Sequence, residues 1–143
     1  MMNKRIIKGA CHCRNITYQL AWPVEEFPIT KRECSCTFCR KHGASYTSHP
    51  DSELTIKVRD KDDITRYRFG HETADFIFCP HCGGMMFALC ELDSTTYAVI
   101  NVNHFENLNQ DEMIHSQTDF DEEDIEGRLA RRKRNWTPAV KFA

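Results

Sequence analysis

The sequence predicts an all-β fold of short antiparallel strands, and two observations carry this prediction. Short apolar or alternating runs, rich in β-branched and aromatic residues, recur at intervals of about ten residues between positions 5 and 102. Before residue 105, no stretch of about twelve residues has apolar positions at the 3.6-residue period of a helix. Long helices are therefore not expected in this part of the chain.

The expected strands follow one another along the chain, with turn-forming clusters between several of them. In order, the runs are RIIKG (5–9), NITYQLAW (15–22), FPIT (27–30), ASYTSH (44–49), ELTIKV (53–58), ITRYRFG (64–70), DFIFC (75–79), MMFALC (85–90) and TYAVINV (96–102). The turn clusters are HPDSE (49–53), RDKDD (59–63), FGHET (69–73) and CPHCGG (79–84). Short β-branched and aromatic runs bounded in this way are typical of strands.

The sequence after Asn103 is polar and charged. An acidic block spans 119–126, and the basic block RLARRKR spans 128–134. We expect these two solvated blocks to neutralise each other. No Gly/Ser linker or repeat interrupts the chain, so we expect one domain over residues 1–143. Within it we expect a core at 5–105 and an irregular C-terminal extension at 106–143 that holds a short helix and a docked tail.

Composition and charge exclude several classes of protein. The formal net charge of −2 and a pI near 6.4 give no overall attraction to nucleic acid or to an anionic membrane. The N-terminal segment MMNKRIIKGACHCRN lacks the apolar run of a signal peptide, and no stretch approaches the ~18 apolar residues of a membrane span. The sequence has eight cysteines, and we expect a cytoplasmic protein in which the closely spaced ones are metal ligands or redox groups rather than disulfides.

Two of the cysteine clusters form the first expected metal site. Cys79 and Cys82 form a C-x-x-C pair within FCPHCGG, the pattern of a zinc knuckle. Such a pair needs two more thiolates, and Cys11 and Cys13 in GACHC are the natural partners. We expect these four cysteines to bind one structural zinc ion, whose binding free energy would be on the order of 10 kcal/mol.

Two alternatives exist for this set of four. The cysteines would be buried thiols without a ligand, or CPHC would be a dithiol redox centre, since C-x-x-C with a proline is also a thioredoxin-like pattern. Redox motifs of that type open a helix in a βαβ unit. Here CGGMMFALC predicts a glycine turn that leads into a strand.

A third cluster, Cys34, Cys36 and Cys39 in CSCTFCRKHG, offers three thiolates without a fourth cysteine nearby. The remaining cysteine, Cys90, lies in an apolar run and is expected to be a small buried hydrophobic residue. Water or substrate would then fill the fourth position of the metal, as in catalytic zinc sites, or a histidine would close the site. His42 and His49 are the candidate histidines, and spacing leaves both arrangements open.

Taken together, four segments resemble a known family. GACHC, CSCTFCRKHGA, FCPHCG and YAVINV, in this order and at these separations, are similar to the glutathione-dependent formaldehyde-activating enzyme family, whose domain is shared with centromere protein V. The resemblance covers about residues 5–105. It implies an Mss4-like, or β-tent, fold with two zinc ions. It also implies that Cys11, Cys13, Cys79 and Cys82 hold a structural zinc, and that Cys34, Cys36 and Cys39 hold a catalytic one.

The function expected from this resemblance is that of a carbon–sulfur lyase. The family joins formaldehyde to glutathione, so we expect a small thiol such as glutathione as substrate. Beside the three-cysteine site, Arg40 and Lys41 are candidate cations, and His42 is a candidate proton shuttle. The alternative is a non-catalytic protein-interaction or chromatin-type module with two structural zinc sites. Nucleic acid is not an expected partner, and the sequence does not indicate an oligomeric state.

Overall fold

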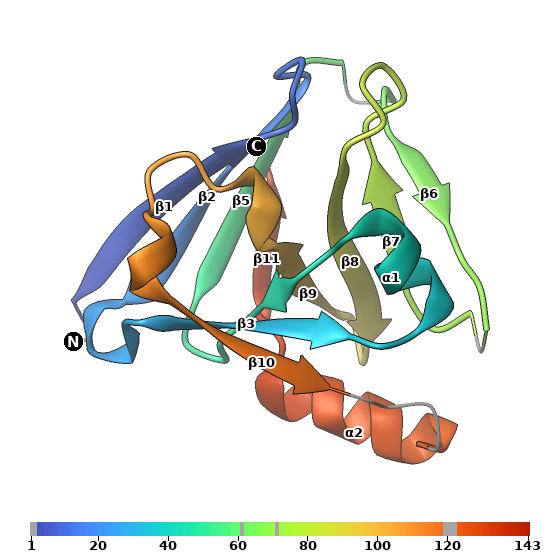
Figure 1. Ribbon diagram of the computed structural model, residues 1–143. Helices are drawn as coiled ribbons and strands as arrows, with labels where there is room; N and C mark the ends of the chain where they lie inside the picture. The colour runs from blue at the N-terminus through green and yellow to red at the C-terminus, as the bar shows by residue number, and fades with distance from the viewer. Residues whose placement is uncertain (1–2, 61, 71, 119–122) are drawn as a thin grey trace.

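In a computed structural model, which describes residues 3–60, 62–70, 72–118 and 123–143, the chain forms two β-sheets that converge at one end. Figure 1 shows them as the two sloping sides of a tent, with the turn between β1 and β2 and the turn between β7 and β8 at the apex. The helix α2 lies at the opposite end. The two ends of the molecule are thus built from different parts of the chain.

The first sheet has four strands in the order β1-β2-β5-β11. Their bounds are Lys4–Ala10 for β1, Ile16–Pro23 for β2, Glu53–Val58 for β5 and Ala139–Phe142 for β11. The pairs β1–β2 and β2–β5 are antiparallel, whereas β11 runs parallel to β5. Side chains along β2 alternate between the core and the surface, as expected for a sheet with one covered face.

The second sheet has seven strands in the order β10-β3-β4-β9-β8-β7-β6. Their bounds are Met113–Thr118 for β10, Ile29–Cys34 for β3, Tyr46–Thr47 for β4, Thr95–Asn101 for β9, Met85–Leu92 for β8, Asp75–Phe78 for β7 and Thr65–Tyr67 for β6. The pairs are antiparallel except β10–β3, which is parallel. Single 3₁₀ turns lie at Val24–Glu26, Val102–His104 and Gln110–Glu112.

The strand β8 separates two hydrophobic clusters. Phe87 and Leu89 belong to the larger cluster, which contains the buried isoleucines and leucines of β1, β2 and β5. Ala88 and Cys90 belong to a second cluster with Phe38 and Trp136. Successive side chains of a strand point to opposite faces, so an almost continuously apolar strand is covered on both sides. Both helices pack on the second cluster, α1 through Phe38 and α2 through Leu129.

The two α-helices are short. The helix α1, Thr37–His42, begins where the Cys36 side chain accepts a hydrogen bond from the Cys39 amide, and it ends at Gly43, which has a φ of 60°. The helix α2, Ile125–Asn135, begins at Asp124, whose side chain accepts from the Gly127 amide. Within the parts of the chain that the structure describes, no helix is long and apolar enough to span a membrane.

The predicted all-β fold is confirmed, but the C-terminal segment is more regular than expected. Along the chain, this segment forms β10 in the seven-stranded sheet, then the helix α2, and then β11 in the four-stranded sheet. The parallel partners of these strands, β3 and β5, lie far away in sequence, and no local pattern indicates such pairings. Part of the acidic block, residues 119–122, lies outside the described residues.

Candidate metal centres and the adjoining cavity

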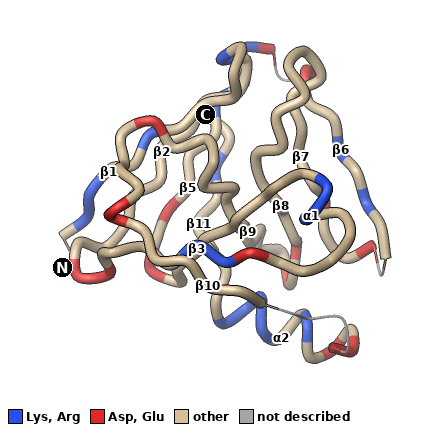
Figure 2. Tube along the Cα trace, viewed as in Figure 1, with Lys and Arg blue, Asp and Glu red and all other residues tan. Residues whose placement is uncertain are grey.

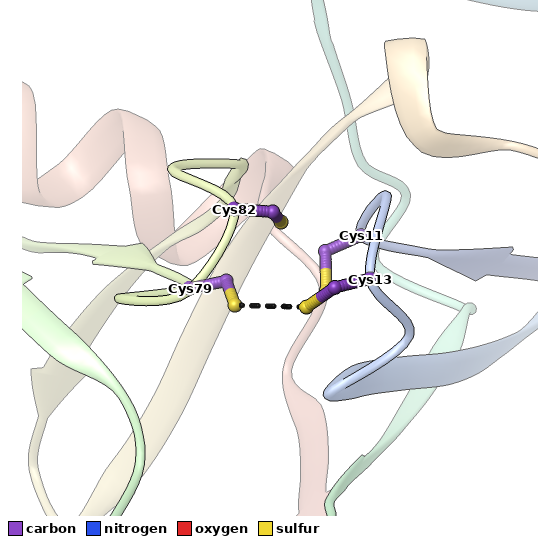
Figure 3. Close-up of side chains that lie close together, drawn as sticks. All are labelled: Cys11, Cys13, Cys79 and Cys82. Atoms are coloured by element: carbon purple, nitrogen blue, oxygen red, sulfur yellow. Dashed lines mark hydrogen bonds between the residues drawn. The ribbon is translucent and has the colours of Figure 1, made fainter.

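Four cysteines from two distant turns come together at the apex of the molecule. Cys11 and Cys13 lie in the turn between β1 and β2, and Cys79 and Cys82 lie between β7 and β8. All four sulfur atoms are within 4.8 Å of one another, and Figure 3 shows the two pairs facing each other. We call this set the four-sulfur group. The pairing predicted from the spacing of the cysteines is the one that the fold brings together.

Backbone hydrogen bonds hold the turn between β1 and β2. The Cys11 amide donates to the Ile16 carbonyl at 3.0 Å, and the Arg14 amide donates to the Cys11 carbonyl at 3.0 Å. The Ile16 amide also donates to the Cys11 sulfur, at 3.3 Å. This sulfur is therefore aimed by the same turn that joins the two strands.

The turn between β7 and β8 curls in a similar way around Cys79. The Gly83 amide donates to the Cys79 carbonyl at 2.9 Å, and Gly83 has a φ of 76°, which favours glycine. The Cys79 amide donates to the Gly84 carbonyl at 2.9 Å, and the chain then enters β8 directly. CPHC thus joins two antiparallel strands, which is not the strand-to-helix setting of a thioredoxin-like redox centre.

The four-sulfur group has the donors and the spacing that a tetrahedral zinc ion needs. A zinc–sulfur bond of about 2.3 Å places sulfurs about 3.8 Å apart at the corners of a tetrahedron. The Cys11 and Cys13 sulfurs are 3.8 Å apart, and the Cys13 and Cys79 sulfurs are 3.5 Å apart. All eight cysteines are free thiols, so no disulfide competes for these atoms. The group can hold a metal ion.

The thiols of the four-sulfur group differ in acidity. Burial raises the pKa of Cys11 to about 12. Burial also opposes ionisation of Cys82, but hydrogen bonds from the backbone of Cys13 and Gly84 outweigh it and lower the pKa of Cys82 to about 6. A bound cation would remove the remaining protons, because metals bind the thiolate form.

The three remaining clustered cysteines lie where β3 passes into α1. Cys34 ends β3, Cys36 caps α1 and Cys39 lies inside the helix. Their sulfurs lie within 4.8 Å of one another, and we call them the three-sulfur group. The Cys39 amide donates to the Cys36 sulfur at 3.4 Å, and the Cys39 sulfur lies 3.4 Å from the Tyr46 hydroxyl oxygen. The group can hold a second metal ion.

Burial and contacts among the sulfurs oppose the ionisation of two of these thiols, Cys36 and Cys39. A hydrogen bond with Cys34, together with burial, raises the pKa of Cys39 strongly. Burial also raises the pKa of Cys36. The three-sulfur group therefore needs a cation, bound or nearby, before its thiols lose their protons at neutral pH.

The histidines proposed to close this group lie elsewhere. Among the described residues, the three-sulfur group contains no histidine nitrogen. The His42 Nδ1 atom is 2.9 Å from the Phe38 carbonyl oxygen, and its ring packs against Phe38 with centroids 4.3 Å apart. His49 packs against Trp22 and lies 3.5 Å from the Glu26 carboxylate. Neither ring is brought to the sulfurs in this structure.

A cavity of about 310 Å³ adjoins the three-sulfur group. Its lining falls into three kinds of side chain. The sulfurs come from Cys34, Cys36 and Cys39; the apolar and aromatic part includes Tyr46, Phe69, Phe76, Ala88, Val99 and Trp136; the cations are Arg32, Arg128, Arg131 and Arg132. Thiols, aromatic rings and guanidinium groups therefore all line the same cavity.

The cations of this cavity are not those expected from the sequence. Arg40 and Lys41, which directly follow Cys39, are exposed and do not line the cavity. Three of the four arginines come instead from α2. Residues 128, 131 and 132 are spaced i, i+3 and i+4, so they share one helical face. This spacing was visible in RLARRKR, but only the docking of α2 directs that face toward the cysteines.

Three further histidine and cysteine residues, His12, His81 and Cys90, belong to neither sulfur group. His12 and His81 are exposed, and His81 is hydrogen-bonded to Asp63. Cys90 is 2% exposed within β8, and it belongs to neither sulfur group. It does contact the Arg132 guanidinium, with its sulfur 3.5 Å from Nη1.

Comparisons with known proteins identify a family for most of the chain. A family model described as glutathione-dependent formaldehyde-activating enzyme matches residues 6–121. A crystal structure of a Rhodobacter sphaeroides protein has 27% sequence identity and a TM-score of 0.56, over 78% of this chain and 99% of that chain. No curated protein matches the chain. The segment matched by the family model includes both sulfur groups and ends before α2.

Proposed function

The chain belongs to the glutathione-dependent formaldehyde-activating enzyme family, and from this premise we propose that it is a zinc-dependent carbon–sulfur lyase. Its substrates would be formaldehyde and a small thiol such as glutathione, and their product an S-hydroxymethyl thiol. We place two zinc ions in the protein, a structural ion in the four-sulfur group and a catalytic ion in the three-sulfur group. We further propose that the reaction takes place in the cytoplasm, where glutathione is kept reduced.

The observation that carries this proposal is the difference in what surrounds the two groups. The four-sulfur group offers a complete tetrahedral set of ligands. The three-sulfur group offers one ligand fewer, and its three cysteines line a cavity of about 310 Å³. A site with three protein ligands and space beside it is the general arrangement of a catalytic zinc.

The proposed reaction needs no oxidant or reductant. The thiol sulfur attacks the carbonyl carbon of formaldehyde, a carbon–sulfur bond forms, the C=O double bond becomes a C–O single bond, and the thiol proton ends on that oxygen. When bound at the three sulfurs, zinc would act as a Lewis acid that keeps a thiolate available at neutral pH. The reverse reaction is the lyase step that releases formaldehyde.

The side chains around the cavity would position the reactants and control charge. The Tyr46 hydroxyl, 3.4 Å from the Cys39 sulfur, orients that ligand. Phe69, Phe76 and Trp136 exclude water from one side of the space. Three thiolates outweigh the charge of one divalent ion, and a substrate thiolate would add to the excess. The cavity arginines supply the opposite charge.

The proposal is tested by carbon-13 exchange spectroscopy with labelled formaldehyde and a panel of thiols. Because the adduct also forms spontaneously, the measured quantity is the rate of interconversion above the protein-free background. We expect the zinc-loaded chain to raise this rate, and the variant Cys36→Ser to return it to background. A wild-type chain that accelerates the exchange of no thiol in the panel would refute the enzyme and favour the interaction module.

A further inference from the structure

Two of the cavity arginines have no carboxylate partner among the described residues, and this observation extends the proposed function. Arg128 and Arg131 form ion pairs with Glu123, with shortest contacts of 3.4 and 2.9 Å. Arg32 and Arg132 form no ion pair with any described acidic group. The positive charge of these two side chains is therefore left for something that enters the cavity.

Arg132 is the more deeply placed of the two. It is 8% exposed, and its Nη1 atom donates to the Thr73 hydroxyl at 2.8 Å, to the Thr73 carbonyl and to the Cys90 sulfur. Its guanidinium lies over the Trp136 ring, 4.7 Å from the centroid. Its Nε atom is buried and has no hydrogen-bond partner in the part of the chain that the structure describes. A buried donor without a partner lowers the stability of the fold unless a ligand satisfies it.

Arg32 lines the same cavity and lies on β3. Its Nη2 atom donates to the Ser48 hydroxyl at 2.6 Å. The Ser48 hydroxyl in turn donates to the carbonyl of Asn135, the last residue of α2, at 2.9 Å. This contact links β3 to the end of α2, so the two guanidinium groups belong to one connected wall.

The surroundings favour an anion in this wall. Arg132 is buried and Arg32 is partly buried, and both line the cavity together with the positively charged Arg131. Guanidinium groups that are partly desolvated and repel one another gain most from a bound anion, and a carboxylate matches their planar donors. Figure 2 marks the Lys and Arg positions that run along α2.

We propose that Arg32 and Arg132 bind a carboxylate of the thiol substrate, and that this contact makes the protein select acidic thiols over neutral ones. The inference rests on the proposed function, because the sulfur of the same molecule would lie at the three-sulfur group. Arg132 lies on α2, beyond the segment that the family model matches. Arg32 lies within that segment, on β3, so the proposed contact combines one residue from the matched segment with one from the C-terminal helix.

A competing explanation is that the arginines only offset the charge of the thiolates. The two explanations differ for a matched pair of thiols, 3-mercaptopropionate and 3-mercaptopropan-1-ol, which differ in the carboxylate alone. A carboxylate contact discriminates between them. Charge compensation at the sulfurs affects both to the same extent.

The test is calorimetric titration of the zinc-loaded full chain with each thiol and with 3-(methylthio)propionate, which carries the carboxylate but no free thiol. We expect the acidic thiol to bind at least tenfold more tightly than the alcohol. Arg132→Met and Arg32→Gln should each remove most of this preference, so that the affinity for the acidic thiol falls much more than the affinity for the alcohol. Arg134→Met, which removes an exposed cation from the same helix, is the matched control and should keep the preference.

Each outcome separates this inference from the proposed function. Equal affinity for both thiols, or an equal loss for both in the arginine variants, overturns the carboxylate contact and leaves the enzyme intact. Arginine-dependent binding of 3-(methylthio)propionate without accelerated exchange of any thiol supports the carboxylate site and refutes the enzyme. Near-ultraviolet circular dichroism establishes that each variant is folded. If Arg132→Met does not fold, Arg32→Gln decides the matter.

Discussion

Both groups consist of cysteines, but they differ in where their members come from along the chain and in what surrounds them. The four-sulfur group takes its members from two turns, with Cys13 and Cys79 separated by 66 positions, and so ties one sheet to the other. The three-sulfur group takes its members from one short stretch, Cys34 to Cys39, and ties nothing distant together. It adjoins a cavity instead. A cysteine cluster that joins remote segments therefore indicates a role in stability, and a local cluster beside a cavity indicates a role in chemistry.

The largest effect is expected from breaking the four-sulfur group. Cys82→Ser removes one of the four proposed ligands, and a structural zinc ion at this site would contribute on the order of 10 kcal/mol to folding. We expect the variant to lose its cooperative thermal transition or to melt far below the wild type, as measured by circular dichroism. Cys90→Ala, at a buried cysteine outside both groups, should keep two zinc ions and lose only about 1 kcal/mol. A Cys82→Ser protein as stable as this control would contradict a structural role.

The next effect separates activity from folding. Cys36→Ser should abolish the acceleration of thiol–formaldehyde exchange and reduce the zinc content from two ions to one. Its sheets should remain intact, because this group joins no remote strands. Elemental analysis and a melting curve on the same sample measure both quantities. Loss of fold equal to that of Cys82→Ser would make both sites structural and would favour the non-catalytic module.

Lowering the pH should release the metal ion of the three-sulfur group before that of the four-sulfur group. Burial raises the pKa of Cys11 to about 12, and a contact with Cys34 plus burial raises that of Cys39, so protons compete with the metal at neutral pH. A lower pH favours the protonated thiols, and metal affinity should therefore fall as the pH falls from 8 to 6. The three-sulfur group, with one ligand fewer, should release its ion first. A chelator titration at each pH measures this order, and simultaneous release would contradict it.

The smallest effect concerns the orientation of one ligand. Tyr46→Phe removes the hydroxyl that lies 3.4 Å from the Cys39 sulfur and changes little else in the cavity. A hydrogen bond to a charged group contributes about 1.5–3 kcal/mol, so we expect the exchange rate to fall by about tenfold or more. Both zinc ions should be retained. An unchanged rate would contradict the role of the Tyr46 hydroxyl in orienting the Cys39 sulfur.

The sequence alone was enough to predict most of the strands before residue 105, the family, and the division of seven clustered cysteines into groups of four and three. The strands can be predicted from local pattern, because alternation and turn residues indicate hairpins. The cysteine pairs Cys11–Cys13 and Cys79–Cys82 are also local, because each lies in one turn. The resemblance to the formaldehyde-activating family is confirmed by the match over residues 6–121. The prediction that Cys90 is a buried core residue is also confirmed.

The charged side chains that line the cavity could not be predicted from local sequence pattern. Arg40 and Lys41 are adjacent to Cys39 in sequence, but the short helix α1 directs them to the surface. Arg128 and Arg131 do pair with an acidic residue, Glu123, yet they also line the cavity. Which face of α2 turns inward depends on the parallel pairings of β10 and β11, and these are contacts between distant segments.

The most direct test of the account is X-ray absorption at the zinc edge, with the zinc-loaded chain and the selenium analogue of glutathione. The open three-sulfur group predicts that the added selenolate binds one of the two zinc ions, so a zinc–selenium scattering path should appear in the wild type and disappear in Cys36→Ser. A spectrum that shows only sulfur neighbours after the selenolate is added would contradict the claim that the two groups differ in function.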